Sequence, residues 1–414
     1  MLEPQSTAFF VFLMVIFAGL IIWLALARQV VFRVLAACLA FIPAVVFGVA
    51  AVNKYYDYYQ NWSAAIADFT TTGAPAAIPG THLGAASGIS KVVGNYVYTK
   101  LAQQDGVTLR LTVHGKLSNI TRTVYVFLPP QYFQPAYKNY RFPAIELLHG
   151  FPGAPQDWIT VLDVTTTLDS LISRGVAKPA VLVMPDANGA RGVSLQCLNQ
   201  VHGPQDATFI AQDVPDYIAH KFRVWAPGRT WGIAGYSEGG FCAANLGLQY
   251  GSRFGLSGVL SGYFVPMKNQ LSHPPRLVNP FGRDKLLRLA NTPTHEVLAL
   301  PPGALIPKFW IGTGSDPADL RAAQMFQQLL QIRQPSVVLD VVSGGNHTMF
   351  TWRTLLPPML EWMTPRLATN ASLAEARAKR LAHHAHPGRP AVRPSPSASP
   401  RRKPVRPKTG QTHG

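Results

Sequence analysis

Two long apolar runs without charged residues open the chain. Residues 8–27 carry no charged side chain, and as a helix they would extend about 30 Å, the thickness of a bilayer's hydrocarbon core. Residues 34–52 form a second run of nearly the same length. The connection between the runs is very short, and a bilayer offers no partners for backbone polar groups. The pattern therefore predicts a transmembrane helical hairpin over residues 1–55.

The charges beside these runs predict how the hairpin is oriented. Arg28 and Arg33 lie in the connection, and basic connections favour the cytoplasmic side of a membrane. The chain after residue 52 is then extracytoplasmic, and the Tyr-rich cluster that begins at Tyr55 matches an interfacial aromatic belt. A cleaved signal peptide is the competing interpretation of the first run. Residues 1–7 contain no base, however, and signal leaders need one.

After the hairpin the pattern changes to that of a linker and then of a compact domain. Residues 56–104 are rich in Ala, Gly and Thr, as linkers are. Alternating apolar and polar residues predict antiparallel strands at 107–113 and 121–127. Short apolar runs follow, with helical stretches between several of them, and together they predict an α/β domain over residues 105–367 with a mainly parallel central sheet and helices on both faces. These runs cover residues 144–148, 180–184, 231–234, 256–260, 309–312 and 337–342.

Composition and charge add a basic tail to this organisation. The 414 residues are 48% hydrophobic and 14% charged, which excludes collagen and a wholly disordered chain. The formal net charge is +17, and residues 370–414 hold ten of the 37 Lys and Arg but one of the 20 Asp and Glu. We expect residues 368–414 to be a disordered, Pro-rich tail. It is either solvated without a specific partner or a polycation that binds an anionic envelope polymer or lipid headgroups. Specific nucleic-acid binding is not favoured, because no aromatic residues are interleaved for base stacking.

A G-x-S-x-G sequence gives the first chemical signal. It runs from Gly235 to Gly239, after a predicted strand and before a segment, residues 241–249, that can be helical. In such a setting the chain turns sharply and presents the serine hydroxyl at the edge of the sheet, and the two glycines leave room for close backbone approach. We therefore expect Ser237 to be a nucleophile. The competing interpretation is an ordinary Gly-rich turn between a strand and a helix.

A serine nucleophile needs a base that is held by a third group. His347 follows the last predicted strand, and Asp316 follows the strand before it. The order Ser237, Asp316, His347 is the order found in α/β-hydrolases. Asp319 is the alternative acid, one turn into the next element, and a helix-capping role is the alternative for His347.

Two further groups of residues complete the expected site. The oxyanion of a tetrahedral intermediate needs backbone N–H donors, which we expect from Glu238 and Phe151; an ordinary β-turn is the alternative at Phe151. Cys197 and Cys242 either form a disulfide, which an extracytoplasmic location permits, or are two buried thiols. The spacing of Cys and His suggests no zinc site, and the sequence has no Gly-rich phosphate loop, so we expect neither a metal nor a cofactor.

Together these motifs resemble the putative-esterase family of α/β-hydrolases, which includes esterase D (S-formylglutathione hydrolase), feruloyl esterases and mycobacterial mycolyltransferases. The resemblance covers about residues 105–365 and implies that Ser237 is the nucleophile, Asp316 the acid and His347 the base, with Phe151 and Glu238 as oxyanion donors. The matching segments are residues 126–130, 147–150 with Trp158, 183–186, 235–240, and 344–347 followed by Trp352 and residues 355–357.

Parts of the chain lie outside this resemblance. The hairpin and the basic tail are closer to actinobacterial envelope members of the family than to cytosolic esterases. Residues 186–199 match no substrate-defining pattern, and neither does the Pro-rich stretch 263–307, which carries Arg276, Arg283 and His295 and could form a lid.

The sequence as a whole predicts a membrane-anchored, extracytoplasmic serine esterase that acts on an ester or acyl-lipid substrate through an acyl-enzyme. One alternative is an acyltransferase that moves an acyl chain onto an envelope glycan or lipid, as mycolyltransferases do. Another alternative is a non-catalytic envelope-binding protein that kept the fold.

Overall fold

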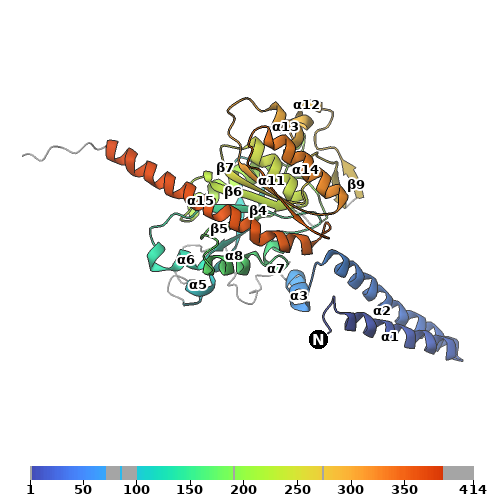
Figure 1. Ribbon diagram of the computed structural model, residues 1–414. Helices are drawn as coiled ribbons and strands as arrows, with labels where there is room; N and C mark the ends of the chain where they lie inside the picture. The colour runs from blue at the N-terminus through green and yellow to red at the C-terminus, as the bar shows by residue number, and fades with distance from the viewer. Residues whose placement is uncertain (1, 71–83, 86–99, 190–191, 273–274, 386–414) are drawn as a thin grey trace, which may run out of the picture. The chain divides into compact units, whose positions relative to one another are not determined.

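The computed structural model describes residues 2–70, 84–85, 100–189, 192–272 and 275–385 (Figure 1). The chain divides into a large unit, Met1–Ser372, and a C-terminal unit, Leu373–Gly414. Most of the expected linker and the part of the basic tail from residue 386 onward lie outside the described residues, so those expectations stay predictions.

The first two helices form the expected apolar hairpin. Helix α1 spans Thr7–Leu26 and α2 spans Val30–Tyr56, and they lie side by side (Figure 1). Both are long and apolar enough to cross a membrane by length and composition. Most of their large apolar side chains are exposed, which would be unfavourable in water and is the normal state of a helix surrounded by lipid. A short helix, α3 (Trp62–Thr70), follows.

A nine-stranded mixed sheet forms the centre of the large unit, with the strand order β1-β2-β3-β5-β4-β6-β7-β10-β11. Strand pairs β2–β3 and β3–β5 are antiparallel, while the strands from β5 through β4, β6, β7 and β10 to β11 pair in parallel. The predicted α/β class with a mainly parallel sheet is therefore confirmed. The strands are β1 Gly84–Ala85, β2 Val107–His114, β3 Thr121–Leu128, β4 Ala144–Leu148, β5 Val181–Pro185, β6 Gly228–Tyr236, β7 Phe254–Leu260, β10 Lys308–Gly314 and β11 Val338–Val342.

Helices cover both faces of this sheet, which is why the central strands are mostly apolar and buried. Every residue of β4 and β5 is buried. One hydrophobic core contains residues of α10, α11 and α14, and the other contains residues of α7, α8 and α15. The helices are α5 Lys100–Asp105, α6 Pro130–Phe133, α7 Asp157–Thr160, α8 Val164–Ser173, α9 Asp206–Thr208, α10 Val214–Lys221, α11 Glu238–Gln249, α12 Lys285–Leu289, α13 Pro293–Ala299, α14 Pro317–Gln331 and α15 Met349–Ala385.

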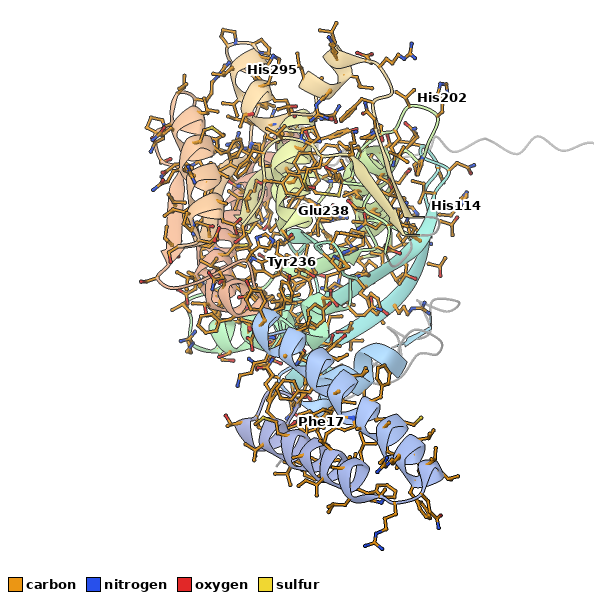
Figure 2. The ribbon with its side chains drawn as sticks, turned by 90° about the vertical axis from the view of Figure 1, so that its right-hand side faces the viewer. Phe17, His114, His202, Tyr236, Glu238 and His295 are labelled. Atoms are coloured by element: carbon orange, nitrogen blue, oxygen red, sulfur yellow. A yellow bond between two sulfur atoms is a disulfide. The ribbon has the colours of Figure 1, made fainter. Side chains whose placement is uncertain are left out.

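The Pro-rich stretch 263–307 folds against the helices on one face of the sheet. It contains the hairpin β8 (Asn269–Ser272) and β9 (Pro275–Val278) as well as α12 and α13. Helix α13 packs on α11 and α14. In Figure 2 His295 lies at one end of the view and the α1–α2 hairpin, marked by Phe17, lies at the other end, with Tyr236 between them.

The C-terminal end of the domain lies later than the sequence suggested. We expected a disordered tail from residue 368, but α15 continues to Ala385. Leu367 and Ala371 are buried, so the helix still packs on the domain there. Residues 368–385 are rich in Ala, the best helix former, and Glu375 pairs with Lys379 one turn later at 2.7 Å. This local preference for helix was missed because the prediction relied on the basic charge of the whole tail.

Glu296 gives the stability of the fold a specific pH dependence. Its side chain is buried in α13, and burial raises the pKa of its carboxyl from 4.5 to about 9 against a weaker opposing hydrogen bond from Gln249. Between these two values the folded protein binds a proton that the unfolded chain releases. Stability is therefore greatest below pH 4.5 in this respect and is lost as the pH rises toward 9.

We therefore predict that Glu296→Gln reduces the loss of the free energy of unfolding that occurs as the pH rises from 4.5 to about 9. The slope that one such group contributes is at most about 1.4 kcal/mol per pH unit. Thermal unfolding of the full chain in detergent at pH 5, 7 and 9 measures it, with Glu361→Gln on the surface of α15 as the control. Parallel pH curves for the wild-type and Glu296→Gln proteins would contradict the prediction.

Candidate active site

Ser237 sits on a sharp turn between β6 and α11. Its φ of 55° and ψ of −118° are rarely adopted by a residue with a side chain. The conformation is held from both sides. The Ser237 N–H donates to the Leu260 carbonyl of β7 at 2.9 Å, and the Ser237 carbonyl accepts from the N–H of Phe241 at 3.1 Å. The turn thus presents the hydroxyl at the carboxyl end of a central strand.

The two glycines of the motif are required by close backbone approach. A Cβ on Gly235 would lie 2.2 Å from the Gly239 carbonyl oxygen, and a Cβ on Gly239 would lie 2.1 Å from the Leu148 carbonyl oxygen. Neither backbone group can move aside without shifting β4 or α11. Any larger residue at these positions would therefore open the turn that carries Ser237.

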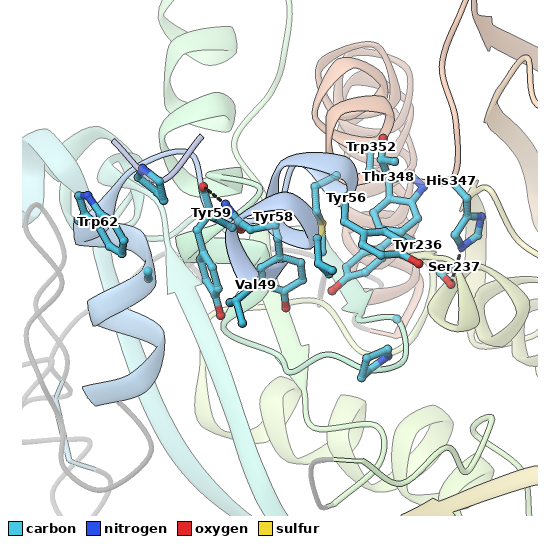
Figure 3. Close-up of a pocket in the computed structure, with 18 of the residues that line it drawn as sticks. Val49, Tyr56, Tyr58, Tyr59, Trp62, Tyr236, Ser237, His347, Thr348 and Trp352 are labelled. Carbon is cyan, nitrogen blue, oxygen red and sulfur yellow. Dashed lines mark hydrogen bonds between the residues drawn. The ribbon is translucent and has the colours of Figure 1, made fainter. Parts of the chain in front are cut away.

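The structure brings His347 to Ser237. The Nε2 atom of His347 lies 2.9 Å from Ser237 Oγ (Figure 3). His347 comes from the loop after β11, where the N–H of Gly345 donates to the Val342 carbonyl at 3.0 Å. Its ring meets Trp352 edge-on, with the ring centroids 5.1 Å apart. A structured loop and an aromatic wall thus fix the imidazole beside the hydroxyl.

The carboxylate on the other side of this imidazole belongs to Asp319, which corrects our expectation of Asp316. Asp319 Oδ2 lies 2.7 Å from His347 Nδ1. Asp316 instead caps α14, where its Oδ1 accepts from the N–H groups of Ala318 at 3.0 Å and Asp319 at 3.3 Å. Its carboxylate already accepts from two helix-terminal donors.

The sequence did contain a signal for this arrangement. Asp316 is followed by Pro317, and Asp at the cap with Pro at the first helical position is a common start of a helix. The next acid, Asp319, lies in the first turn of α14 with its side chain free to reach the neighbouring loop. The capping pattern predicts the role of Asp316 better than its position directly after the strand does.

The two residues expected to donate to an oxyanion lie beside the serine. Glu238 is the first residue of α11, and Gly150 and Phe151 line the same pocket as Ser237. The loop of Phe151 is fixed by the buried side chain of His149. Its Nδ1 contacts the Gly150 carbonyl oxygen at 2.9 Å, and its Nε2 accepts from the N–H of Ala187 at 3.0 Å.

A disulfide and a buried carboxyl hold Ser194 and Cys197 against the start of α11. Cys197 and Cys242 are joined by a disulfide, with their Cα atoms 5.6 Å apart, which is the first of the two alternatives that the sequence left open. The hydroxyl of Ser194 donates to the buried Glu238 carboxyl, and burial raises the pKa of that carboxyl. Both links lie within one or two turns of Ser237, so this loop belongs to the support of the site.

A pocket of about 760 Å³ opens next to Ser237. It is lined from the sheet side by residues around Ser237, His347 and Trp352, and from the other side by residues of the N-terminal hairpin (Figure 3). None of its lining residues comes from the described part of the stretch 263–307. The idea that this stretch covers the site as a lid is therefore wrong for its described residues. Elsewhere in the described chain, no group of three His, Cys, Asp or Glu side chains could hold a metal.

The hairpin's part in this pocket was missed by sequence reasoning. We assigned the Tyr cluster after the second apolar run to a membrane interface, yet the hydroxyl of Tyr58 donates to Asp157 at 2.7 Å, and the hydroxyl of Tyr236 donates to the same carboxylate at 3.0 Å. Burial and the Asp157 carboxylate raise the pKa of Tyr58, so its phenol stays protonated as a donor. No local pattern pairs residues so far apart in the sequence.

Comparison with protein families finds a match over most of the chain. The family model described as "Putative esterase" matches residues 116–387, which include Ser237, Asp319 and His347. An uncharacterized protein of Corynebacterium glutamicum is 26% identical over 251 residues, which are 59% of this chain and 57% of that protein. The chain thus spans little more than half the length of this curated relative.

Solved structures share the fold. A ferulic acid esterase has a TM-score of 0.52 and 23% identity, covering 63% of this chain and 98% of its own. An S-formylglutathione hydrolase from Agrobacterium tumefaciens has a TM-score of 0.51 and 18% identity, covering 63% and 96%. A fluorophosphonate-binding serine hydrolase of Staphylococcus aureus has a TM-score of 0.50 and 18% identity, covering 63% and 98%. These likenesses identify the α/β-hydrolase fold.

Proposed function

Because the chain belongs to the putative esterase family, we propose that it is a serine esterase that cleaves a carboxylic ester through an acyl-enzyme. The observation that carries this proposal is the line of hydrogen-bonding contacts from Asp319 through His347 to Ser237, with distances of 2.7 Å and 2.9 Å. A bare serine hydroxyl is a poor nucleophile at neutral pH, and this arrangement supplies the base and the group that orients it.

The reaction follows from these positions. His347 Nε2 takes the proton of the Ser237 hydroxyl as Oγ attacks the ester carbonyl, and Asp319 holds the proton on Nδ1 and stabilises the imidazolium. The N–H groups of Glu238 and Phe151 stabilise the oxyanion. His347 then gives its proton to the leaving alcohol, and the acyl group stays on Ser237. In the second half His347 deprotonates water, which attacks the acyl-enzyme, and His347 then returns the proton to Ser237 Oγ as the acid leaves.

We propose water as the acceptor of the acyl group. The side chain of His347 is 41% exposed, so solvent reaches the base directly. An acyltransferase would pass the same intermediate to an alcohol, and a non-catalytic binding protein would have no use for the aligned triad. Hydrolysis is therefore the reaction that the site supports best.

Ser237→Ala tests the catalytic proposal. We expect hydrolysis of p-nitrophenyl butyrate to fall by about 10⁴-fold or more, because the nucleophile is lost, and labelling by a fluorophosphonate to disappear. Ser170→Ala, an exposed serine of α8, is the matched control and should keep both signals. Labelling that persists in Ser237→Ala, or that never occurs in the wild-type chain, would refute the mechanism.

The two aspartates separate a catalytic role from a structural one. We expect Asp319→Asn to lower kcat by roughly 10⁴-fold, because the imidazole loses the carboxylate that sets its tautomer. Asp316→Asn should lower kcat by less than about tenfold, because an amide oxygen still caps the helix. Steady-state kinetics on the same ester measure both. If Asp316→Asn lowers kcat more than Asp319→Asn does, the assignment of Asp319 as the acid is wrong.

We also propose that the hairpin anchors the enzyme in a membrane with the catalytic part outside. Arg28 lies in the short connection between α1 and α2 and Arg33 in the first turn of α2, and such basic residues are typical of cytoplasmic loops. The disulfide between Cys197 and Cys242 suits an oxidising compartment outside the cytosol.

Reporter fusions test this orientation. Alkaline phosphatase fused after residue 60 should be active and green fluorescent protein at the same place dark, because the first needs an oxidising compartment and the second folds in the cytosol. A matched pair of fusions after residue 28 should give the opposite result. A fluorescent, phosphatase-inactive fusion at residue 60 would overturn the proposed sidedness.

A further inference from the structure

The pocket beside Ser237 is shared between the catalytic residues and the membrane hairpin. Its lining includes Ser237 and His347 on one side and Val45, Val46 and Val49 of α2 on the other. In Figure 3 Val49, Tyr56, Tyr236 and Ser237 follow one another across the pocket. A volume of about 760 Å³ lies within the range of small-molecule binding sites. One continuous space thus joins the nucleophile to the side of an apolar helix.

Several contacts hold the end of α2 to the catalytic part. Arg353 of α15 pairs with the Asp57 carboxylate and donates to the Asp57 carbonyl at 2.8 Å and to the Tyr58 carbonyl at 2.9 Å. It also donates to the Val161 carbonyl at 2.8 Å. Arg353 directly follows Trp352, whose ring packs on His347. The residues after α2 are therefore fixed to the same helix turn that positions the base.

The pocket has few polar groups, and several of them are already paired. Among the described residues that line the pocket, none is Asp, Glu, Lys or Arg. The side chain of Asn53 both donates to and accepts from the backbone of Tyr59, at 2.9 Å and 2.8 Å, and the hydroxyls of Tyr58 and Tyr236 donate to Asp157. A sugar or a charged group would lose its hydration here and find few partners, whereas a hydrocarbon chain has no polar groups that need partners.

The hairpin wall of the pocket is part of a membrane-spanning surface. Val49 is 65% exposed and Val52 is 59% exposed, on a helix long and apolar enough to cross a bilayer. In the proposed membrane these side chains face hydrocarbon, so the far end of the pocket is continuous with the acyl region of the bilayer. A chain that lies along α2 could reach Ser237 without crossing water.

We propose that the substrate is a membrane lipid ester with a long acyl chain, which binds with its carbonyl at Ser237 and its chain along α2. The inference rests on the proposed esterase function and assigns the hairpin a second role, as one wall of the substrate site. The bilayer then serves both as anchor and as the source of substrate.

A bulky residue on the hairpin wall tests the proposal. Val49→Trp narrows the pocket at its α2 side. The ratio of kcat/KM for p-nitrophenyl palmitate to that for p-nitrophenyl butyrate should fall by roughly tenfold in the full chain in detergent, since hydrophobic pockets discriminate at about this level. Val34→Trp makes the same change on α2 outside the pocket and should leave the ratio unchanged. An unchanged ratio in Val49→Trp overturns the proposal.

A photoreactive probe gives an answer that does not depend on the variants. A fluorophosphonate with a long alkyl chain and a diazirine near its tip should label Ser237 and, after irradiation in vesicles, crosslink to residues 45–52. Crosslinks confined to the catalytic part would overturn the lipid assignment while the esterase stands. Failure of a short-chain fluorophosphonate to label Ser237 would overturn the esterase proposal itself, and with it this inference.

Discussion

The backbone turn at Ser237 is the constraint on which the rest of the site depends. A serine at φ 55° is strained, and it persists because β7 accepts its N–H and because Gly239 lies directly against the backbone of β4. The buried parallel strands on either side supply the rigidity that keeps this turn closed. The loops that bring His347, Asp319 and Phe151 to the hydroxyl leave the same edge of the sheet. The apolar core is therefore what converts three distant side chains into one reactive group.

A second level of organisation joins this edge to the hairpin. Asp157 accepts from Tyr58 and Tyr236, one on each side of the pocket, and Arg353 binds the segment directly after α2. Each of these contacts is polar and at least partly buried, so removing one partner would weaken the attachment of the hairpin to the catalytic part. The hairpin is thus joined to the catalytic part by specific contacts as well as by the continuity of the chain.

Much of the fold and the centre of the site could be predicted from the sequence. The short apolar runs marked the central strands because strands buried on both faces contain little else, and the glycines around Ser237 marked the turn. The acid was misassigned because two aspartates lie within one helix turn, and only the capping pattern separates them. The end of the domain was misplaced because net charge was weighed above the local helix preference of residues 368–385.

The pocket's hairpin wall could not be predicted at all. Arg353 and Asp57 are 296 residues apart, and no sequence motif links the two residues. Contacts of this kind follow from the packing of whole elements, which a linear pattern does not encode. The Tyr cluster was assigned to a membrane interface, but the hydroxyl of one of its members, Tyr58, donates to the buried carboxylate of Asp157.

The Arg353 contacts also bear on how the enzyme can be handled in the laboratory. A truncated fragment beginning near residue 100 would retain Ser237, His347 and Asp319 and would be easier to express. It would nevertheless leave Asp157, Trp352 and Arg353 uncovered where the hairpin residues had packed. Catalytic rates from such a soluble fragment would describe a cleft with one side missing, and inhibitors selected against it would be fitted to a surface that the intact protein does not expose.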